Sequence, residues 1–131
     1  MNAVYEQDMY YRFNPFAKNW IATSGVMNYC ERNKCFWVLD TLASYVPTLA
    51  KEKGVDYCLI VTVEVSPDQK AVFKITQEEH DEEGNSADKT LIRQDIDYTD
   101  LKEGLKFWAI NETSGSYDPT AQTVVLLPDE Y

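Results

Sequence analysis

The sequence predicts an α+β fold in which an N-terminal helical pair packs on one face of a four- to five-stranded antiparallel sheet. Apolar residues recur at helical spacing between residues 23 and 46, and in five later segments they alternate with polar residues. Short polar links join several of those segments. The 131 residues, 44% of them hydrophobic, can bury one core, so we expect a single domain over residues 1–131.

The segment through Asn19 is expected to form an irregular aromatic arm, because it shows no clean period and Pro15 interrupts it. A first helix should begin at Thr23, a favourable N-cap residue, and end near Asn33. Its apolar face comprises Val26, Tyr29 and Cys30. The short length of this helix means that it depends on packing against the rest of the domain.

A second helix should follow a tight turn at Asn33 and Lys34, because a broad apolar stripe recurs there at three- and four-residue spacing. The stripe comprises Phe36, Val38, Leu39, Leu42, Ala43, Tyr45 and Val46. Pro47 should end the helix or begin a separate turn, because proline lacks the backbone N–H that a helix interior uses.

Five segments are expected to be strands of an antiparallel meander: Tyr57 to Val65, Ala71 to Glu78, Lys89 to Tyr98, Leu105 to Ile110 and Gln122 to Leu127. Their alternation separates an inner face, covered by the helices, from an outer face in solvent. The inner face comprises Val61, Val63, Phe73, Ile75, Ile92 and Ile96. The outer face comprises Thr62, Glu64, Lys74, Thr76, Arg93, Asp95 and Asp97.

The negative charge of the chain is concentrated in one segment. Twelve Lys and Arg residues and 22 Asp and Glu residues give a formal net charge of −10. Residues 78–103 alone hold ten acidic and three basic residues, and the densest run extends from Glu78 to Asp88. Such a surface repels nucleic acid and anionic membranes and attracts basic proteins, so we expect neither nucleic acid nor a membrane as a direct partner.

Two explanations of the acidic run remain open. The simpler one is a solvated hairpin tip that keeps the protein soluble, because charged loops are common. In the other, the carboxylates imitate a nucleic-acid backbone and occupy the phosphate-binding surface of a basic protein. The residues assigned to this partner-binding surface are Glu78, Glu79, Asp81, Glu82, Glu83, Asp88, Asp95 and Asp97. A calcium loop is disfavoured, because its ligand order is missing.

The sequence holds no recognisable motif for catalysis, a cofactor or a metal. The carboxylates around His80, the only histidine, favour its imidazolium form, which is a poor general base at neutral pH. Cys30, Cys35 and Cys58 lack the spacing of a zinc knuckle and are expected to be buried free thiols. We therefore predict a non-enzymatic protein, located in the cytoplasm because signal-peptide features are absent from its first residues.

Aromatic residues offer a second possible binding surface. Trp20, Trp37, Trp108 and the N-terminal tyrosines have the large contact area that interfaces use. In the alternative explanation these residues stabilise the fold: Trp37 belongs to the core, and Trp20 fixes the arm onto the domain. The choice between the two roles is left open for Tyr10, Tyr11 and Trp108. Asn111 begins a glycosylation sequon, to which we assign no role because we expect the protein in the cytoplasm.

Several short pieces resemble a family of unknown function that comprises small proteins of phages, prophages and bacteria. The pieces are Trp20, Thr23-Ser24-Gly25-Val26 with Tyr29, Phe36-Trp37-Val38-Leu39-Asp40 with Ala43-Ser44, and Leu126-Leu127-Pro128-Asp129-Glu130-Tyr131. The resemblance covers the N-terminal helical third and the extreme C-terminus, and it implies a phage or mobile-element origin without catalytic residues. The acidic run and the three cysteines depart from the family pattern.

Charge and resemblance together lead to the hypothesis of a small acidic phage-type inhibitor. Its partner would be a basic host protein, namely a nucleic-acid-binding defence protein such as a CRISPR effector. The main alternative is a structural or oligomerising protein that acts through its aromatic N-terminal arm, with the acids serving only solubility. The sequence leaves the oligomeric state open.

Overall fold

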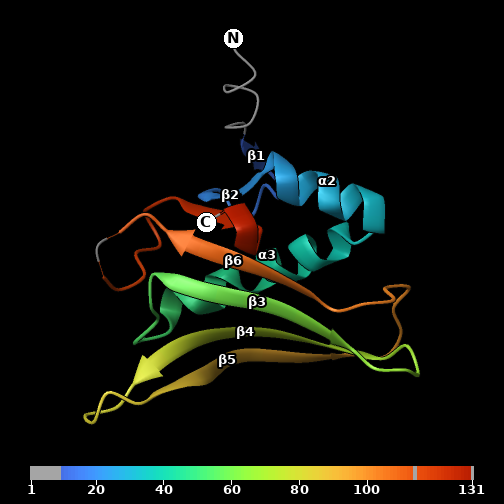
Figure 1. Ribbon diagram of the computed structural model, residues 1–131. Helices are drawn as coiled ribbons and strands as arrows, with labels where there is room; N and C mark the ends of the chain where they lie inside the picture. The colour runs from blue at the N-terminus through green and yellow to red at the C-terminus, as the bar shows by residue number, and fades with distance from the viewer. Residues whose placement is uncertain (1–9, 114, 131) are drawn as a thin grey trace.

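The computed structural model describes residues 10–113 and 115–130. Over these residues the protein has the predicted α+β fold, with two α-helices packed on one face of a twisted sheet (Figure 1). The elements, in chain order, are β1 (Tyr10–Arg12), β2 (Trp20–Thr23), α2 (Ser24–Asn33), α3 (Phe36–Lys51), β3 (Cys58–Val65), β4 (Ala71–His80), β5 (Ser86–Ile96), β6 (Leu105–Asn111), β7 (Thr123–Leu126) and the 3₁₀ helix η1 (Pro128–Glu130).

The sheet is larger than predicted, and it is mixed. Its seven strands follow the order β1-β2-β7-β6-β3-β4-β5. Strands β2 and β7 run parallel, with Trp20 opposite Thr123, whereas the remaining neighbours are antiparallel. The prediction of a four- to five-stranded, wholly antiparallel sheet is therefore wrong in strand number and in the β2–β7 pair. The β3–β4–β5 part is the antiparallel meander that the sequence predicted.

Of the two additional strands, β1 lies in the segment that was expected to be an irregular arm, and β2 directly follows that segment. Strand β1 pairs antiparallel with β2, which places Tyr11 opposite Ala22. Trp20 and Ala22 of β2 belong to the core, with 1% and 0% of their surface exposed. Strands of three and four residues are too short to show an alternation in the sequence. Residues 1–9 of the predicted arm, and Tyr131, lie outside the described residues.

The first helix has the predicted bounds. The side-chain oxygen of Thr23, its N-cap, accepts a hydrogen bond of 3.2 Å from the backbone N–H of Val26. At the other end Lys34 adopts a left-handed conformation, with φ of 53°, and its N–H caps the carbonyl groups of Cys30 and Glu31. Local capping chemistry therefore fixes both ends of α2.

The second helix continues beyond the predicted end at Pro47, as far as Lys51. Because Pro47 has no N–H, the carbonyl oxygen of Ala43 loses its helical donor at this position. The prediction that Pro47 stops the helix is wrong because tertiary packing outweighs this loss: Leu49, in the turn that follows, is fully buried in the core.

The predicted inner face of the sheet is confirmed. Val61, Val63, Phe73 and Ile75 are fully buried, and Ile92 and Ile96 pack half-buried against the same core. Two aromatic contacts attach the helices to this face. Tyr29 of α2 meets Phe107 of β6 edge to face at 5.8 Å between ring centroids, and Tyr45 of α3 stacks on Phe73 at 6.0 Å.

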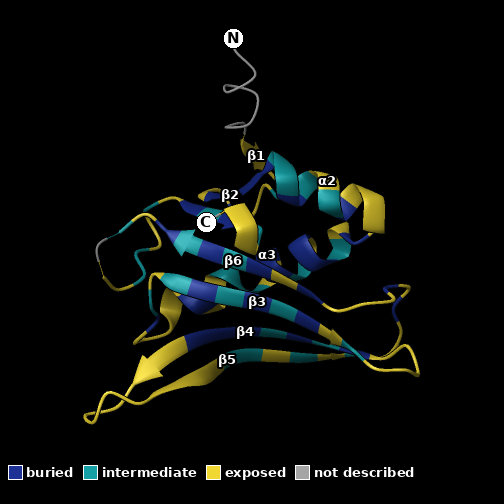
Figure 2. Ribbon diagram, in the orientation of Figure 1, coloured by how far each residue is buried: buried dark blue, intermediate teal, exposed yellow. Residues whose placement is uncertain are grey.

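The outer face of the sheet is polar only in part. Over β4 and β5 it carries the predicted charged residues, such as Lys74 and Arg93. Over β3, β6 and β7 it carries half-buried apolar residues, so the prediction of a wholly solvated face holds only for the β4–β5 side (Figure 2). These apolar residues are Cys58, Ile60, Trp108, Ile110 and Val124.

The two ends of the described chain meet beside the first turn of α2. The Thr23 hydroxyl donates a hydrogen bond of 2.7 Å to Oε1 of Glu130, which also accepts one of 2.8 Å from the Leu127 N–H. A Cβ atom on Gly25 would lie 2.5 Å from the Glu130 carboxylate, so glycine leaves room for this contact. The Thr-Ser-Gly-Val piece and the C-terminal Leu-Leu-Pro-Asp-Glu piece of the family pattern therefore form one contact.

We expect Thr23→Ala to lower the free energy of unfolding by about 1–2 kcal/mol, because it removes an N-cap and a side-chain donor at once. Urea denaturation followed by circular dichroism measures the change. Thr23→Ser keeps the hydroxyl and serves as the control, with an expected loss below about 0.5 kcal/mol. Equal losses in the two variants would contradict a role for the hydroxyl.

Candidate functional site

The acidic run forms the free end of the hairpin that β4 and β5 make. The β4–β5 pairing extends from Ala71 opposite Ile96 to His80 opposite Ser86. Strand β3 pairs with β4 only as far as Thr76, so beyond this residue the sheet narrows to a ribbon of two strands. In Figure 1 this ribbon extends past the end of β3 at the lower left. We call residues 78–88 the acidic hairpin.

Every residue from Glu78 to Thr90 is exposed, as the continuous yellow colour of the ribbon in Figure 2 shows. Six of the eight predicted site residues lie here: Glu78, Glu79, Asp81, Glu82, Glu83 and Asp88. The register sets Glu78 directly opposite Asp88. Like charges in such a cross-strand pair destabilise a sheet, so these carboxylates do not serve the stability of the ribbon.

Asp81 has a structural role in the turn at the tip. Its Oδ1 accepts hydrogen bonds from the backbone N–H groups of Glu83, at 2.9 Å, and of Asn85, at 2.8 Å. The bond from the Asn85 N–H is the largest cause that lowers the pKa of Asp81 below its ordinary value. Gly84 completes the turn with a φ of 86°, a left-handed conformation that favours glycine.

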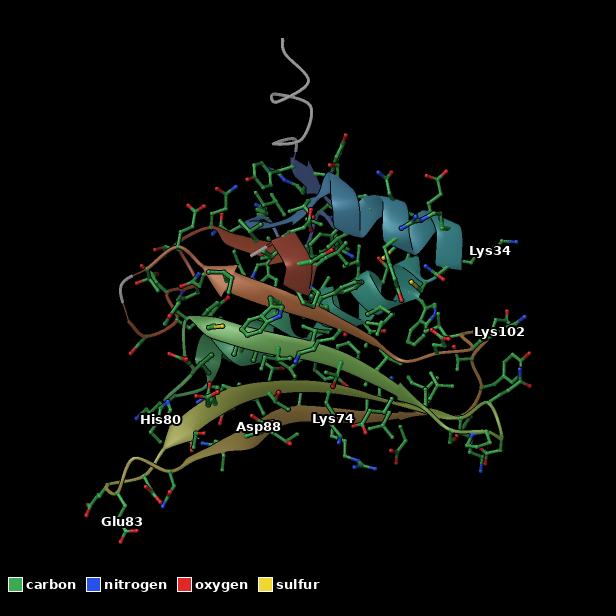
Figure 3. All side chains as sticks on the ribbon, in the orientation of Figure 1. Lys34, Lys74, His80, Glu83, Asp88 and Lys102 are labelled. Atoms are coloured by element: carbon green, nitrogen blue, oxygen red, sulfur yellow. The ribbon has the colours of Figure 1, made fainter. Side chains whose placement is uncertain are left out.

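Few cations neutralise the acidic hairpin. The Nε2 atom of His80 lies 3.0 Å from Oε1 of Glu78, and the Lys89 ammonium lies 3.7 Å from Glu79. Within residues 10–113 and 115–130, no cation forms an ion pair with the remaining four carboxylates, Asp81, Glu82, Glu83 and Asp88. In Figure 3 the labelled residues Lys34 and Lys102 lie at the opposite end of the molecule from Glu83. The hairpin therefore keeps a net negative charge.

The structure does not bring the remaining two predicted residues to the hairpin. Asp95 stands seven positions beyond Asp88 on β5, which is roughly 23 Å at about 3.3 Å per strand residue. Asp97 follows just past the end of that strand. Near them the charges are mixed: Asp95 accepts a bond from Arg93 at 3.2 Å, and Glu64 pairs with Lys74 at 2.6 Å. The length of β5 therefore separates Asp95 and Asp97 from the acidic hairpin.

A cavity of about 630 Å³ lies at the base of the acidic hairpin, and the sequence analysis missed it. Gln77 organises its wall: its Oε1 accepts a hydrogen bond of 2.8 Å from the Asp56 N–H, and its Nε2 donates one of 2.9 Å to the Gly54 carbonyl. The loop after β6 joins this wall, because the Tyr57 N–H donates to the Gly115 carbonyl at 3.2 Å. The polar residue Gln77 within an apolar strand was the one sign of this site in the sequence. The backbone groups to which it binds could not be identified without the structure.

The cysteines divide into two kinds. Cys30 and Cys35 are fully buried, as predicted, and their side chains share a hydrogen bond. Cys58 is only half-buried and lines the cavity, so the prediction of a buried thiol does not hold for it. Its pKa is raised, first by desolvation and then by the nearby charges of Asp56 and Glu78, which keeps the thiol neutral.

The tryptophans also occupy different surroundings. Trp20 is buried, and its indole N–H donates to the Tyr117 hydroxyl at 3.2 Å, so it fixes the N-terminal segment onto the sheet as predicted. Trp37, expected in the core, is half-buried and packs against the edge of the core from α3. Trp108 is half-buried on the outer face of β6, where its ring lines the cavity.

The sequon residue Asn111 is buried. Its Nδ2 donates to the Asp118 carbonyl at 3.1 Å and to the Thr123 hydroxyl at 3.0 Å, while its Oδ1 accepts from the Asp118 N–H at 2.8 Å. This side chain thus holds the loop between β6 and β7, which contributes Gly115 and Ser116 to the cavity.

The fold and this surface define a small α+β protein with an acidic, exposed hairpin beside a cavity. None of the described helices is long and apolar enough to cross a membrane. The model of a family of unknown function, DUF6876, matches residues 1–131. The chain belongs to this family, which confirms the predicted membership of a family of unknown function. No curated protein and no solved structure matches the chain.

Proposed function

We propose that the protein is a non-enzymatic binding protein that places its acidic hairpin on a basic surface of a partner protein. The observation that carries the proposal is the two-stranded ribbon beyond Thr76, whose exposed carboxylates lack a matching set of cations. The opposed pair of Glu78 and Asp88 is costly for the isolated fold, and a cationic partner would relieve that repulsion.

The spacing of the charges supports a nucleic-acid-binding partner surface. One strand of DNA carries one charge per roughly 3.4 Å of helix axis, and a phosphate-binding surface accepts such a dense row of charges. The acidic hairpin likewise concentrates six carboxylates within residues 78–88 of a narrow ribbon. A defence protein of a bacterial host, such as a CRISPR effector, has the required basic groove and is the partner class that we propose.

The proposal predicts a steep dependence on salt. The protein, immobilised as the full chain, is used to capture partners from a bacterial lysate, and the affinity of a purified partner is measured from about 50 to about 200 mM salt. We expect the affinity to fall tenfold or more over this range, and duplex DNA to compete for the partner. An affinity that neither salt nor DNA changes would contradict the proposal.

A second candidate function rests on the exposed aromatic residues at the β1 edge of the sheet. Phe16 has 88% of its surface exposed, and Tyr10 has 52%. Such side chains suit an oligomerising or structural interface, which salt should hardly affect. Sedimentation of the native protein and of Phe16→Ser would detect self-association through this segment, and identical monomers in both samples would contradict it.

A further inference from the structure

The cavity beside the acidic hairpin has walls of two kinds. One wall is the outer face of the sheet, where Ile60 of β3 stands directly opposite Trp108 of β6 and Cys58 follows in the next row. The rest of the lining includes Glu78 and His80 of β4 and the loop from Gly54 to Tyr57. The site therefore joins an apolar and aromatic floor to a polar rim, an arrangement typical of ligand pockets of this size.

The charge of the cavity is negative. Asp56 and Glu78 line it, and no lysine or arginine is among its lining residues. The imidazole of His80 lies 3.0 Å from Glu78, so it already occupies part of the rim as a hydrogen-bond donor. Burial, and after it the charges of Asp56 and Glu78, raise the pKa of the Cys58 thiol, which therefore stays neutral and adds no positive charge to the lining. Anionic ligands such as phosphates are therefore disfavoured.

The aromatic residues of the cavity suit a cation. The ring of Trp108 already has one cation nearby, since the Lys106 ammonium lies 5.6 Å from its centroid. Lys106 itself is not among the lining residues. Tyr57, which also lines the cavity, is partly exposed and is its second aromatic residue. A planar cation can contact such rings with its face while its edge donates hydrogen bonds to a carboxylate.

We propose that this cavity binds the guanidinium group of an arginine side chain, which a basic partner protein inserts next to the acidic hairpin. Arginine fits better than lysine, because its planar group contacts aromatic rings and can donate two parallel hydrogen bonds to Glu78. The inference rests on the proposed function, since it assumes a basic protein partner, and it adds an anchoring contact to a surface otherwise recognised by charge alone.

The test uses a defined probe instead of the partner. The full-length ¹⁵N-labelled protein is titrated with acetyl-Gly-Arg-Gly-amide and, in parallel, with the same peptide carrying citrulline, which is uncharged and nearly isosteric. We expect only the arginine peptide to shift the amide signals of Tyr57, Cys58 and Glu78 and the indole signal of Trp108. Equal shifts from both peptides, or shifts centred on Glu82 and Glu83 at the hairpin tip, would overturn the inference.

Two matched variants locate the site. Glu78→Gln should weaken binding of the arginine peptide at least fivefold, because it removes the carboxylate at the rim. Glu83→Gln makes the same chemical change at the tip and should leave binding within twofold. Both side chains are exposed, so neither change is expected to disturb folding. Unchanged binding in Glu78→Gln would overturn the assignment.

The experiments distinguish failure of the cavity assignment from failure of the proposed function. If the arginine peptide binds as expected but a purified partner shows no salt dependence, the proposed function fails while the cavity assignment stands. If the partner affinity depends on salt but the peptide does not bind the cavity, the assignment fails alone.

Discussion

Neutralising Glu82, Glu83 and Asp88 together, as E82Q/E83Q/D88N, should weaken affinity for the basic partner by roughly tenfold to a hundredfold. These carboxylates are exposed, and no described cation forms an ion pair with them, so their charge is available to a partner. The exchange leaves the turn bonds of Asp81 in place. Isothermal titration calorimetry with the purified partner, at one fixed low salt concentration, measures the loss.

The matched control is E64Q/D95N/D97N, which changes residues of β3 and of the end of β5, away from the acidic hairpin. It removes the same number of charges, but Glu64 and Asp95 already pair with Lys74 and Arg93. We expect a change in affinity of less than twofold. Equal losses in the two triple variants would mean that total charge, and not the acidic hairpin, determines binding.

Phe73→Ala should lower the free energy of unfolding by about 3–5 kcal/mol, a large share of the roughly 5–15 kcal/mol typical of a domain. Phe73 is fully buried near the start of β4, opposite Val63 and Gln94, and its ring stacks on Tyr45 of α3. Truncation would leave a cavity between helix and sheet and loosen the strand that carries the acidic hairpin. Urea denaturation at equilibrium measures the loss.

Val72→Ala is the control for this prediction, because Val72 is the adjacent residue on the half-buried outer face. Its expected cost is about 1 kcal/mol, since less surface becomes exposed and water can fill the space. A cost as large as that of Phe73→Ala would show that the helix-covered face is not the main core.

The parts of the fold that local chemistry determines could be predicted from the sequence. Thr23 and Lys34 fix the ends of α2 through capping and a left-handed turn, and alternation over eight or more residues identifies β3, β4 and β5. Strands β1 and β2 could not be predicted, because they are too short to show a pattern and β2 takes its place in the sheet by pairing with the distant strand β7. The helical position of Pro47 likewise depends on packing beyond its own helix.

Of the candidate site, too, one part could be predicted from the sequence and another part could not. The acidic hairpin could be located from the sequence because its residues are consecutive, whereas Asp95 and Asp97 were added to it from the outer face of the sheet. The extended backbone of β5 places these two residues far from the hairpin. The cavity was missed because its lining comes from four separate stretches of the chain, which the Gln77 side chain and a loop pairing hold together.

The parallel pairing of β2 with β7 has a consequence for biosynthesis. During translation, β7 leaves the ribosome roughly a hundred residues after β2, so the hydrogen bonds between β2 and β7 form only after β3 to β6 have been synthesised. A protein truncated before Thr123 would lack β7, so β2 and β6 would each expose an unpaired strand edge to which another chain could bind. Nascent or prematurely terminated chains are therefore the species most prone to aggregate.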